Sequence, residues 1–305
     1  MKDEDFVLGM DFGGTKTAIA TADARGEIIL HDNVPTLPDA EQAVSRALEV
    51  AQELVSRSRR KHGGEFRYVG VATMGITQET KVLFAPNVNG WEQLQLPRIL
   101  RMTFGGIPIV IANDVKSAAV AELKWGALRN ADPGLFVNLG TGIAAALCVG
   151  GRVIQGAQRA SGEIAYNPLT EYDVQGVRSG VAPFEEIVGG GWIKHHAREQ
   201  LGLEMGAGDI LRQSKHNPTI RAWIQPILRT LAFQLTSLVI ALNPARVVIG
   251  GGLSQVHEVI FPSLLRSFEE FVPFPPELTV AHFQHEAGLM GAIALALGEV
   301  EGYLA

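Results

Sequence analysis

Ile109-Val-Ile-Ala-Asn-Asp-Val-Lys-Ser-Ala-Ala-Val-Ala-Glu-Leu-Lys-Trp-Gly126 carries the clearest fold signal in this sequence. The apolar residues Ile107 and Ile109 to Ile111 predict a strand, and the Ala-rich segment after Asn113-Asp114 has the spacing of a helix. A strand that leads into a helix places the Asn113 amide and the Asp114 carboxylate at the C-terminal end of the strand, where open α/β sheets bind ligands. Taken alone, the pair would also suit a simple helix cap, because Asn and Asp are favoured there.

A strand-turn-strand pattern occurs twice in the chain. Phe6 to Thr21 reads as two strands joined by the turn Asp11-Phe-Gly-Gly-Thr-Lys16, and Leu135 to Ile154 repeats the pattern around Leu139-Gly-Thr-Gly142. A repeat of whole supersecondary units indicates two like domains. We expect each domain to offer a Gly-Thr loop to a cleft between them.

Glycines in these turns let backbone N–H groups approach an anion closely, although a plain tight hairpin would also use glycine. Asp11 is placed to hold a hydrated Mg²⁺ ion, which needs few protein ligands. A third glycine-rich strand end, Val247-Val-Ile-Gly-Gly-Gly252, allows a flat ligand close to the backbone. None of the three is a dinucleotide fingerprint or a Walker A loop, so those nucleotide-binding modes are not supported.

Size and composition indicate an ordinary globular protein. The 305 residues are 47% hydrophobic and 19% charged, which suffices for one large or two medium domains. A net charge of −6 gives no sign of nucleic-acid or membrane binding, and the single Cys148 fits a reducing compartment. The stretch from Ile220 to Leu242 is apolar but carries Arg221 and Arg229, so we expect a buried helix rather than a membrane span. With no signal peptide expected at the N-terminus, we predict a cytoplasmic protein.

Two further segments supply candidate site residues. The expected strand from Tyr68 to Met74 leads into Gly75. The loop Pro86-Asn-Val-Asn-Gly-Trp91 places the hydrogen-bonding Asn87 near an aromatic side chain. That loop is either turn chemistry or the lining of a pocket.

In their order along the chain, these motifs resemble the ROK family (repressor, open reading frame, kinase), whose sugar kinases belong to the actin/Hsp70/hexokinase superfamily. The loop from Pro86 to Trp91 is similar to the family's Pro-Asn-Leu-Pro-Gly-Trp segment. Several motifs in the correct order are more specific than any one of them. The resemblance spans almost the whole chain and rests on Asp11-Phe-Gly-Gly-Thr-Lys16, Asn113-Asp114, Leu139-Gly-Thr-Gly142, Asn243-Pro-x-x-Val-Val-Ile-Gly-Gly-Gly252 and Ala287-Gly-Leu-Met-Gly-Ala292.

The resemblance implies a role for each motif. Asp114 would be the general base that takes the proton of the attacking sugar hydroxyl, and Asp11 would hold Mg²⁺ through water. The implied ATP contacts are Asp11, Gly13, Gly14, Thr15, Lys16, Gly140, Thr141, Gly142, Gly250, Gly251 and Gly252. The implied sugar contacts are Gly75, Asn87, Asn113, Asp114, Glu163, Tyr166 and Glu185. The resemblance also implies a homodimer.

The sugar-binding end departs from the family pattern. Ala160-Ser-Gly-Glu-Ile-Ala-Tyr-Asn-Pro168 resembles the family's Ala-Gly-Glu-Ile-Gly-His segment, with Glu163 matching its sugar-binding Glu and Tyr166 in place of the His. Tyr166 either reads a different group of the sugar or is a core aromatic residue with a satisfied hydroxyl. Glu163 and Glu185 would otherwise be surface carboxylates, but their motif context favours a site.

The resemblance implies that in typical members this His binds a structural zinc together with three cysteines of a Cys-x-Cys-Gly-x-x-Gly-Cys-x-Glu run. None of those cysteines is present, and Glu185 matches only the Glu at the end of the run. We therefore predict no structural zinc. We interpret His195-His196, His282 and His285 as surface or helix residues.

The fold we predict is therefore α/β, with two ribonuclease H-like domains of the actin/Hsp70/hexokinase superfamily around a nucleotide- and sugar-binding cleft. The smaller domain is expected to hold residues 1–112 and 288–305, and the larger one residues 113–287. The expected activity is transfer of the γ-phosphoryl group of ATP to a hydroxyl, O6 in the expected case, of glucose or a related hexose or amino sugar.

Two other classes of protein stay open. A non-catalytic sugar sensor would bind sugar at Asp114 without turnover, although both phosphate loops argue against it. An actin- or Hsp70-like ATPase would share the nucleotide motifs but would not need Asn113-Asp114 together with Gly162-Glu163. A repressor of the family would carry an N-terminal helix-turn-helix domain, for which a meander that begins at Phe6 leaves no room. The sequence favours a sugar kinase.

Overall fold

The computed structural model describes residues 1–78, 80–83, 88–298 and 302–305 and forms two compact units. The first unit holds residues 1–126, 152–161 and 286–305, and the second holds residues 127–151 and 162–285. The first unit extends past the predicted boundary at residue 112 because helix α3 (Asp114–Lys124) packs against helix α9 (Ala287–Leu297). The division into domains at residues 112 and 113 stays a prediction.

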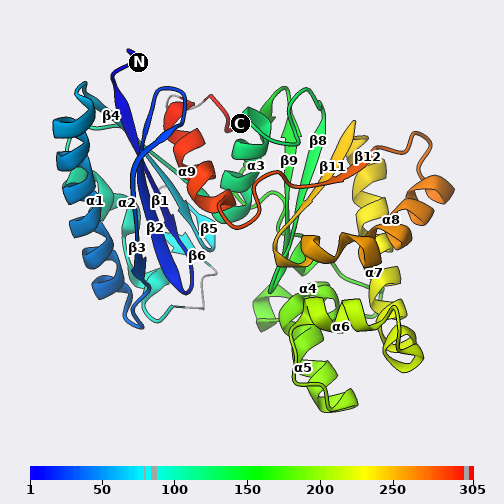
Figure 1. Cartoon of the computed structure of the whole chain (residues 1–305). Coiled ribbons are helices and arrows are strands. Elements are labelled where there is room, and N and C mark those ends of the chain that lie inside the picture. The colour runs from blue at the N-terminus through cyan, green and yellow to red at the C-terminus, as the bar shows by residue number, and fades with distance from the viewer. Residues whose placement is uncertain (79, 84–87, 299–301) are drawn as a thin grey trace. The chain divides into compact units, whose positions relative to one another are not determined.

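The first unit is built on a five-stranded sheet with the order β3-β2-β1-β4-β7 (Figure 1). Its first three strands form the predicted antiparallel meander, and β4 and β7 run parallel to β1. Phe12, Thr73 and Asn113 are in register at the ends of the three parallel strands, so these strands end at one edge of the sheet. The strands are β1 (Phe6–Phe12), β2 (Lys16–Asp23), β3 (Ile28–Pro35), β4 (Phe66–Thr73) and β7 (Ile109–Asn113).

Helices cover both faces of this sheet (Figure 1). Helix α1 (Ala40–His62) packs on β2 and β3, and α9 packs on β1 and β4. The α9 face is a close approach of backbones, because a Cβ atom at Gly70 would overlap the carbonyl of Ala292. A short 3₁₀ turn, Trp91–Gln93, is followed by α2 (Leu96–Phe104), which begins there because Pro97 suits the first turn of a helix. A small two-stranded sheet is formed by β5 (Ile76–Thr77) and β6 (Val82–Leu83).

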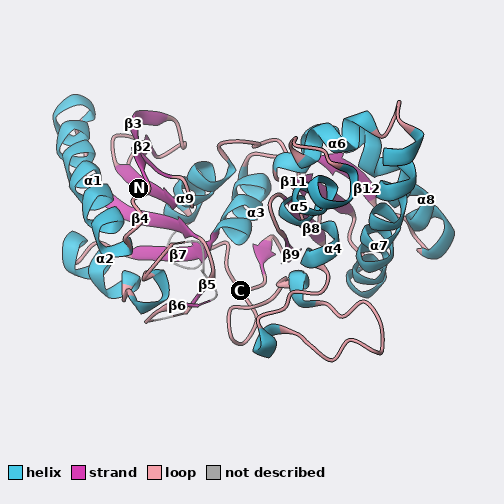
Figure 2. Ribbon diagram, turned by 90° about the horizontal axis from the view of Figure 1, so that it is seen from below, coloured by secondary structure: helices cyan, strands magenta, loops and turns pink. Residues whose placement is uncertain are grey.

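The second five-stranded sheet has the corresponding order, β10-β9-β8-β11-β12, so the repeat in the sequence is a repeat of sheet topology. Its strands are β8 (Gly134–Leu139), β9 (Ile143–Val149), β10 (Arg152–Val153), β11 (Arg246–Gly250) and β12 (Glu277–Val280). The helices of this part of the chain are α4 (Glu185–Val188), α5 (Gly190–Leu201), α6 (Ala207–Gln213), α7 (Pro218–Leu242) and α8 (His257–Phe271) (Figure 2).

Helix α7 is long and apolar enough, by length and composition, to cross a membrane. It nevertheless places Ile224, Leu231, Leu235 and Val239 in the hydrophobic core of the second unit, where each is at most 4% exposed. Its apolar character is therefore that of a core helix, as the sequence predicted.

Candidate active site

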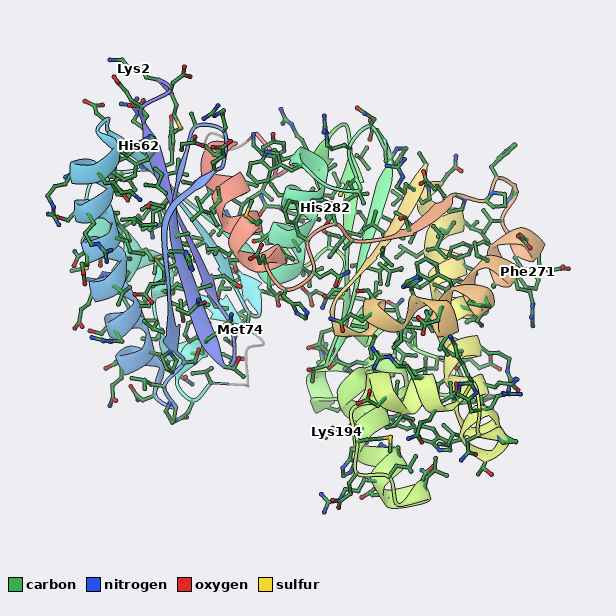
Figure 3. The ribbon with its side chains drawn as sticks, viewed as in Figure 1. Lys2, His62, Met74, Lys194, Phe271 and His282 are labelled. Carbon is green, nitrogen blue, oxygen red and sulfur yellow. The ribbon has the colours of Figure 1, made fainter. Side chains whose placement is uncertain are left out.

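The parallel strands of the first sheet bring the predicted residues of the first unit to one edge. Asp11 lies on β1, one residue before its end, Gly75 follows β4, and Asp114 begins α3 directly after β7. Met74, labelled in Figure 3, marks this edge next to Gly75. The sheet thus collects at one place side chains that are separated by up to a hundred residues of sequence.

Asn113 and Asp114 both accept hydrogen bonds from backbone N–H groups at the start of α3. The Asn113 side-chain oxygen accepts a hydrogen bond from the backbone N–H of Lys116 (2.8 Å), so Asn113 is an N-cap and is 7% exposed. Asp114 accepts from the N–H of Val115 (2.9 Å), while its side chain remains exposed. Capping therefore occupies the Asn113 oxygen and leaves the Asp114 carboxylate accessible to a substrate.

The two carboxylates of this edge have perturbed protonation equilibria. Burial and, to a lesser extent, the charge of Asp114 raise the pKa of Asp11, the charge of Lys16 opposes them, and the net result is a pKa of about 7. Desolvation by the surrounding protein also raises the pKa of Asp114, whereas hydrogen bonds from the backbone N–H groups and the charge of Lys116 lower it. Titratable groups perturbed by both desolvation and a neighbouring charge are typical of functional sites.

The first turn of α9 is in close contact with Asp11. A Cβ atom added at Gly288 would overlap the Asp11 carboxylate, so glycine is required for this approach. The N-terminus of a helix favours a nearby negative charge through the helix dipole. Gly288 was noted in the sequence only as part of a family segment, and its contact with Asp11 could not be read from the sequence.

The predicted first phosphate loop, Gly13 to Lys16, is a turn between β1 and β2. The N–H of Gly13 donates to the carbonyl of Lys16 (3.1 Å), and the hydroxyl of Thr36 donates to the carbonyl of Gly13 (2.7 Å). Gly14, Thr15 and Lys16 are exposed. The loop is therefore held from one side while its tip is free to meet a ligand.

The second unit has a glycine-lined pocket of about 760 Å³. It brings together the second and third predicted loops, although Gly142 and Gly250 are not among the lining residues. Gly251 has φ +79°, and a side chain there would overlap the carbonyl of Leu139. The lining residues are Asn138, Gly140, Thr141, Gly190, Gly191, Lys194, Ala207, Gly208, Gly251, Gly252 and Leu253.

The Gly140-Thr141 loop of this pocket is fastened to the start of α5. The N–H of Gly190 donates to the carbonyl of Gly140 (2.9 Å), and the N–H of Gly191 donates to the carbonyl of Thr141 (2.8 Å). Lys194, one turn further along α5 and labelled in Figure 3, also lines the pocket. No motif in the sequence points to Lys194, because only the packing of α5 on the loop brings it to the pocket.

The predicted sugar segment lies in the second unit. Gly162 has φ +81° and a Cβ atom there would overlap the carbonyl of Ala145, so only glycine fits before Glu163. Glu163 and Tyr166 flank and end a 3₁₀ turn, Ile164–Tyr166, and both are half-buried. Glu185 accepts a hydrogen bond from the N–H of Ile143 (3.0 Å), directly after the Gly140-Thr141-Gly142 loop. Its carboxylate also occupies the space that a side chain at Gly142 would need.

Several sequence predictions are not decided by this geometry. Asn87 lies outside the residues that the structure describes. Within the described ranges, no group of three or more His, Cys, Asp or Glu side chains could hold a metal ion, and the absence of zinc stays a prediction. His195 pairs with Glu199 on an exposed face of α5, and His196 stacks on Trp192.

The two repeated sheets and the glycine-lined loops define a protein of the actin/Hsp70/hexokinase fold. The chain belongs to the ROK family, whose family model matches residues 7–299. It is 24% identical to a glucokinase of Streptomyces coelicolor, with 95% of this chain and 96% of the relative covered. It is 27% identical to an N-acetylmannosamine kinase of Salmonella heidelberg, with 96% and 98% covered. The structure of a ROK hexokinase from Thermus thermophilus superposes with a TM-score of 0.82 at 27% identity, covering 97% of this chain and 99% of that one.

Proposed function

We propose that this protein is an ATP-dependent sugar kinase with Asp114 as its general base. The observation that carries the proposal is the in-register edge of the first sheet, which gathers Asp11 and the accessible Asp114 carboxylate in one place. Family relatives named glucokinase and N-acetylmannosamine kinase support the same reaction class.

In the proposed reaction, Asp114 accepts the proton of the attacking sugar hydroxyl. The hydroxyl oxygen forms a bond to the γ-phosphorus of ATP, and the bond from that phosphorus to the leaving oxygen of ADP breaks. Because phosphoryl transfer needs mainly positioning and charge neutralisation, one oriented carboxylate and several backbone N–H donors suffice for the protein's part. A raised pKa brings a general base closer to the neutral pH at which it must accept a proton.

The residues fit a hydrated Mg²⁺ ion at Asp11. Two carboxylates interact unfavourably at this edge, and a divalent cation would relieve both the repulsion and the desolvation of Asp11. When bound, Mg²⁺ neutralises phosphate charge. We propose that Thr15, Lys16 and the Gly13-Gly14 backbone bind phosphate oxygens, and that the glycine-lined pocket of the second unit binds the nucleotide.

We propose that the acceptor is O6 of glucose or of a related hexose or amino sugar, bound by Asn113, Glu163, Tyr166 and Glu185. The two named sequence relatives act, by their names, on different sugars, one an unmodified hexose and one an N-acetylated amino sugar. Tyr166 would then read a sugar group different from the one read by the family's His.

The proposal is tested by ADP release from purified protein with ATP and Mg²⁺ against a sugar panel. The panel holds glucose, mannose, fructose, allose, N-acetylglucosamine, N-acetylmannosamine and a free amino-glucose. Saturable release with one sugar is expected, and identification of the product by NMR would show the phosphorylated oxygen. A protein that binds a sugar in a thermal-shift assay but releases no ADP would be a sensor, and the kinase proposal would fail.

We also propose that the protein is a homodimer, supported by an apolar face on the second unit. A hollow of about 580 Å³ between α7 and α8 is lined by Phe233, Ile240 and Phe271, which are 62%, 49% and 66% exposed. Phe271 is labelled in Figure 3. Contiguous exposed apolar side chains mark interaction surfaces in soluble proteins.

We expect Phe271→Glu to convert the dimer to a monomer in size-exclusion chromatography with light scattering, because it replaces an apolar side chain of the proposed interface by a charge that association would have to desolvate. Phe274→Glu is the matched control, since Phe274 is 77% exposed but does not line the hollow. A wild-type protein that is monomeric at micromolar concentration would contradict the proposal, as would a Phe271→Glu variant that remains dimeric.

A further inference from the structure

A buried amide on α7 contacts the chain just after Tyr166. Gln234 is 8% exposed, and its side chain makes two hydrogen bonds to consecutive residues. Its Nε2 donates to the carbonyl of Pro168 (2.9 Å), and its Oε1 accepts from Nδ2 of Asn167 (3.2 Å). Donor and acceptor of one side chain are therefore both used to hold one short segment.

The position of Gln234 in α7 makes this pairing notable. Ile227, Leu231 and Leu235 on the same helix belong to the hydrophobic core of the second unit. A buried amide beside this core costs free energy unless both of its polar ends are paired. An apolar residue would fill this place more simply, so the amide here does something that packing alone does not.

What the amide holds is the end of the candidate sugar segment. Asn167 follows Tyr166 directly, and its backbone N–H donates to the carbonyl of Ile164 (2.9 Å), which closes the 3₁₀ turn. The two hydrogen bonds from Gln234 on α7 to Asn167 and Pro168 thus hold the end of this turn, which follows Glu163 and ends at Tyr166. All of these residues belong to the second unit, so the link depends on one compact body.

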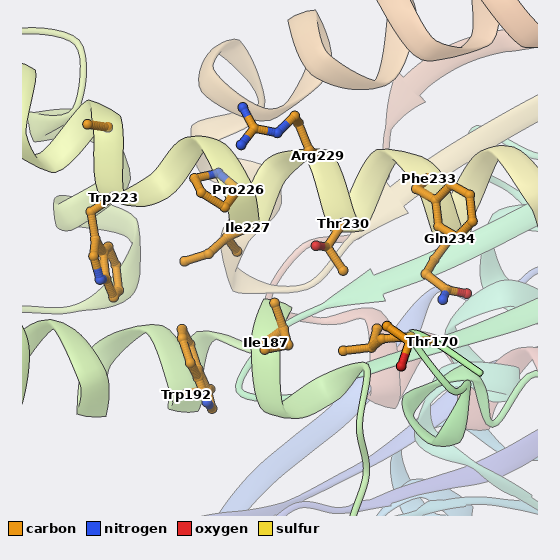
Figure 4. A pocket seen from close by; sticks show the side chains of 12 residues that line it. Thr170, Ile187, Trp192, Trp223, Pro226, Ile227, Arg229, Thr230, Phe233 and Gln234 are labelled. Atoms are coloured by element: carbon orange, nitrogen blue, oxygen red, sulfur yellow. The ribbon is translucent and has the colours of Figure 1, made fainter. Parts of the chain in front are cut away.

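The chain beyond the link is held in a second way. Asp173 accepts hydrogen bonds from the N–H groups of Leu169 and Thr170, which closes the loop that follows. Figure 4 shows Gln234 extending from α7 on the side of the pocket where Thr170 lies. The segment from Tyr166 to Thr170 is therefore fixed to the core at Gln234 and closed on itself at Asp173.

We propose that Gln234 is a positioning residue for sugar binding, because its two hydrogen bonds hold the Glu163–Tyr166 turn in the arrangement that receives the sugar. This inference rests on the proposed function, since it assumes that the turn contacts the sugar. Gln234 acts through Asn167 and Pro168 and does not itself touch the substrate.

Gln234→Leu keeps the size of the side chain and removes both hydrogen bonds. We expect the KM for the sugar to rise about 10-fold, because the turn would then be in its receptive arrangement about a tenth of the time. The KM for ATP and kcat at saturating sugar are expected to stay within about twofold, since the nucleotide pocket and Asp114 do not depend on Gln234. Peptides covering residues 164–172 should exchange amide hydrogens faster than in the wild type.

Thr236→Val is the matched control. Thr236 lies on the same helix, is 6% exposed, and also makes a partly buried hydrogen bond, but to Ser267 of α8 (2.7 Å). Its loss should lower the melting temperature comparably while leaving the sugar KM and the exchange of residues 164–172 unchanged. If Gln234→Leu does not yield folded protein, Asn167→Ala is the second variant. It removes the hydrogen bond between Asn167 and Gln234 by changing the half-buried Asn167. We expect a smaller rise in the KM for the sugar, again with little change in the KM for ATP or in kcat.

Three results decide the inference. Faster exchange together with a selective rise in the sugar KM supports it. Unchanged exchange in Gln234→Leu would show that the amide does not hold the turn, and faster exchange with an unchanged sugar KM would show that the turn needs no such positioning. If the wild type phosphorylates none of the sugars, the proposed function fails. The hydrogen-exchange measurement still tests whether Gln234 holds the turn. Unchanged exchange in Gln234→Leu overturns this inference independently of the proposed function.

Discussion

Asp114→Asn is expected to lower kcat by about 100-fold to 10,000-fold, the range that a general base contributes. Asparagine has nearly the same shape and can still accept the hydrogen bond from the Val115 N–H, so α3 should begin at the same residue. It cannot accept the proton of the attacking hydroxyl. Sugar binding by calorimetry and nucleotide binding by fluorescence should therefore remain within a few-fold of the wild type while turnover, measured as ADP release, is lost.

Asp39→Asn is the control for the same chemical change. Asp39 caps α1 in the same unit, accepts from the N–H of Gln42, and asparagine is an equally good cap, so activity and stability should not change. Near-normal turnover of Asp114→Asn would remove Asp114 from the role of base. Loss of sugar binding along with turnover would instead make it a binding residue.

The sequence allowed the fold to be predicted because its decisive signals are local. Two apolar stretches predict strands, and they lead into Asp11-Phe-Gly-Gly-Thr15 and into Asn113-Asp114. Each stretch therefore predicts both a turn and the polar side chains at the end of its strand. Helix α1 (Ala40–His62) likewise has local signals at both ends, since Asp39 caps its start and Arg59, Arg60, Lys61 and His62 make its last turn basic. The repeated meander likewise predicted two sheets of one topology.

What the sequence did not reveal depends on contacts between distant segments. Gly288 approaches Asp11 across more than 270 residues, and Gln234 binds Asn167 across 67 residues. Lys194 reaches its pocket only because α5 is fastened to the Gly140-Thr141 loop. No periodicity or spacing within a segment reports such pairs, so their residues read as ordinary helix positions. Asn113 shows the converse case, since its capping role was the simpler local interpretation and the structure contains that cap.

Gly288→Ala is expected to lower kcat/KM for MgATP strongly, because it displaces the Asp11 carboxylate. Gly288→Ala would place a methyl group where the Asp11 carboxylate lies, and the carboxylate is the flexible partner that must move. We expect kcat/KM for MgATP to fall about 100-fold, which corresponds to about 2.7 kcal/mol of lost transition-state stabilisation. The fold should survive, because a side chain rather than backbone is displaced, and the circular dichroism spectrum and a melting temperature close to that of the wild type would verify this.

Gly106→Ala is the control for Gly288→Ala, since a Cβ atom at Gly106 would meet nothing within 4 Å and the residue lies in the same unit. It should leave both activity and stability unchanged. If Gly288→Ala retains wild-type kcat/KM for MgATP over a range of Mg²⁺ concentrations, the position of Asp11 does not matter for the reaction. Asp11 would then lose its proposed role as the ligand of a hydrated Mg²⁺ ion.

The raised pKa of Asp11 adds a test in the absence of Mg²⁺ that does not depend on turnover. Its carboxyl has a pKa of about 7 in the folded protein against 3.8 as the ordinary value, so the folded state binds the proton more tightly than the unfolded state. The ionised group therefore destabilises the fold, by nothing below about pH 4, by an amount that grows between pH 4 and 7, and by a constant amount above. Asp11→Asn removes this penalty, which includes the repulsion from Asp114. Its melting temperature should exceed that of the wild type by more at pH 8 than at pH 5, although it is expected to be nearly inactive. An Asp11→Asn protein that is less stable than the wild type at pH 8 would contradict this prediction. It would show that the ionised carboxylate stabilises the fold rather than destabilising it.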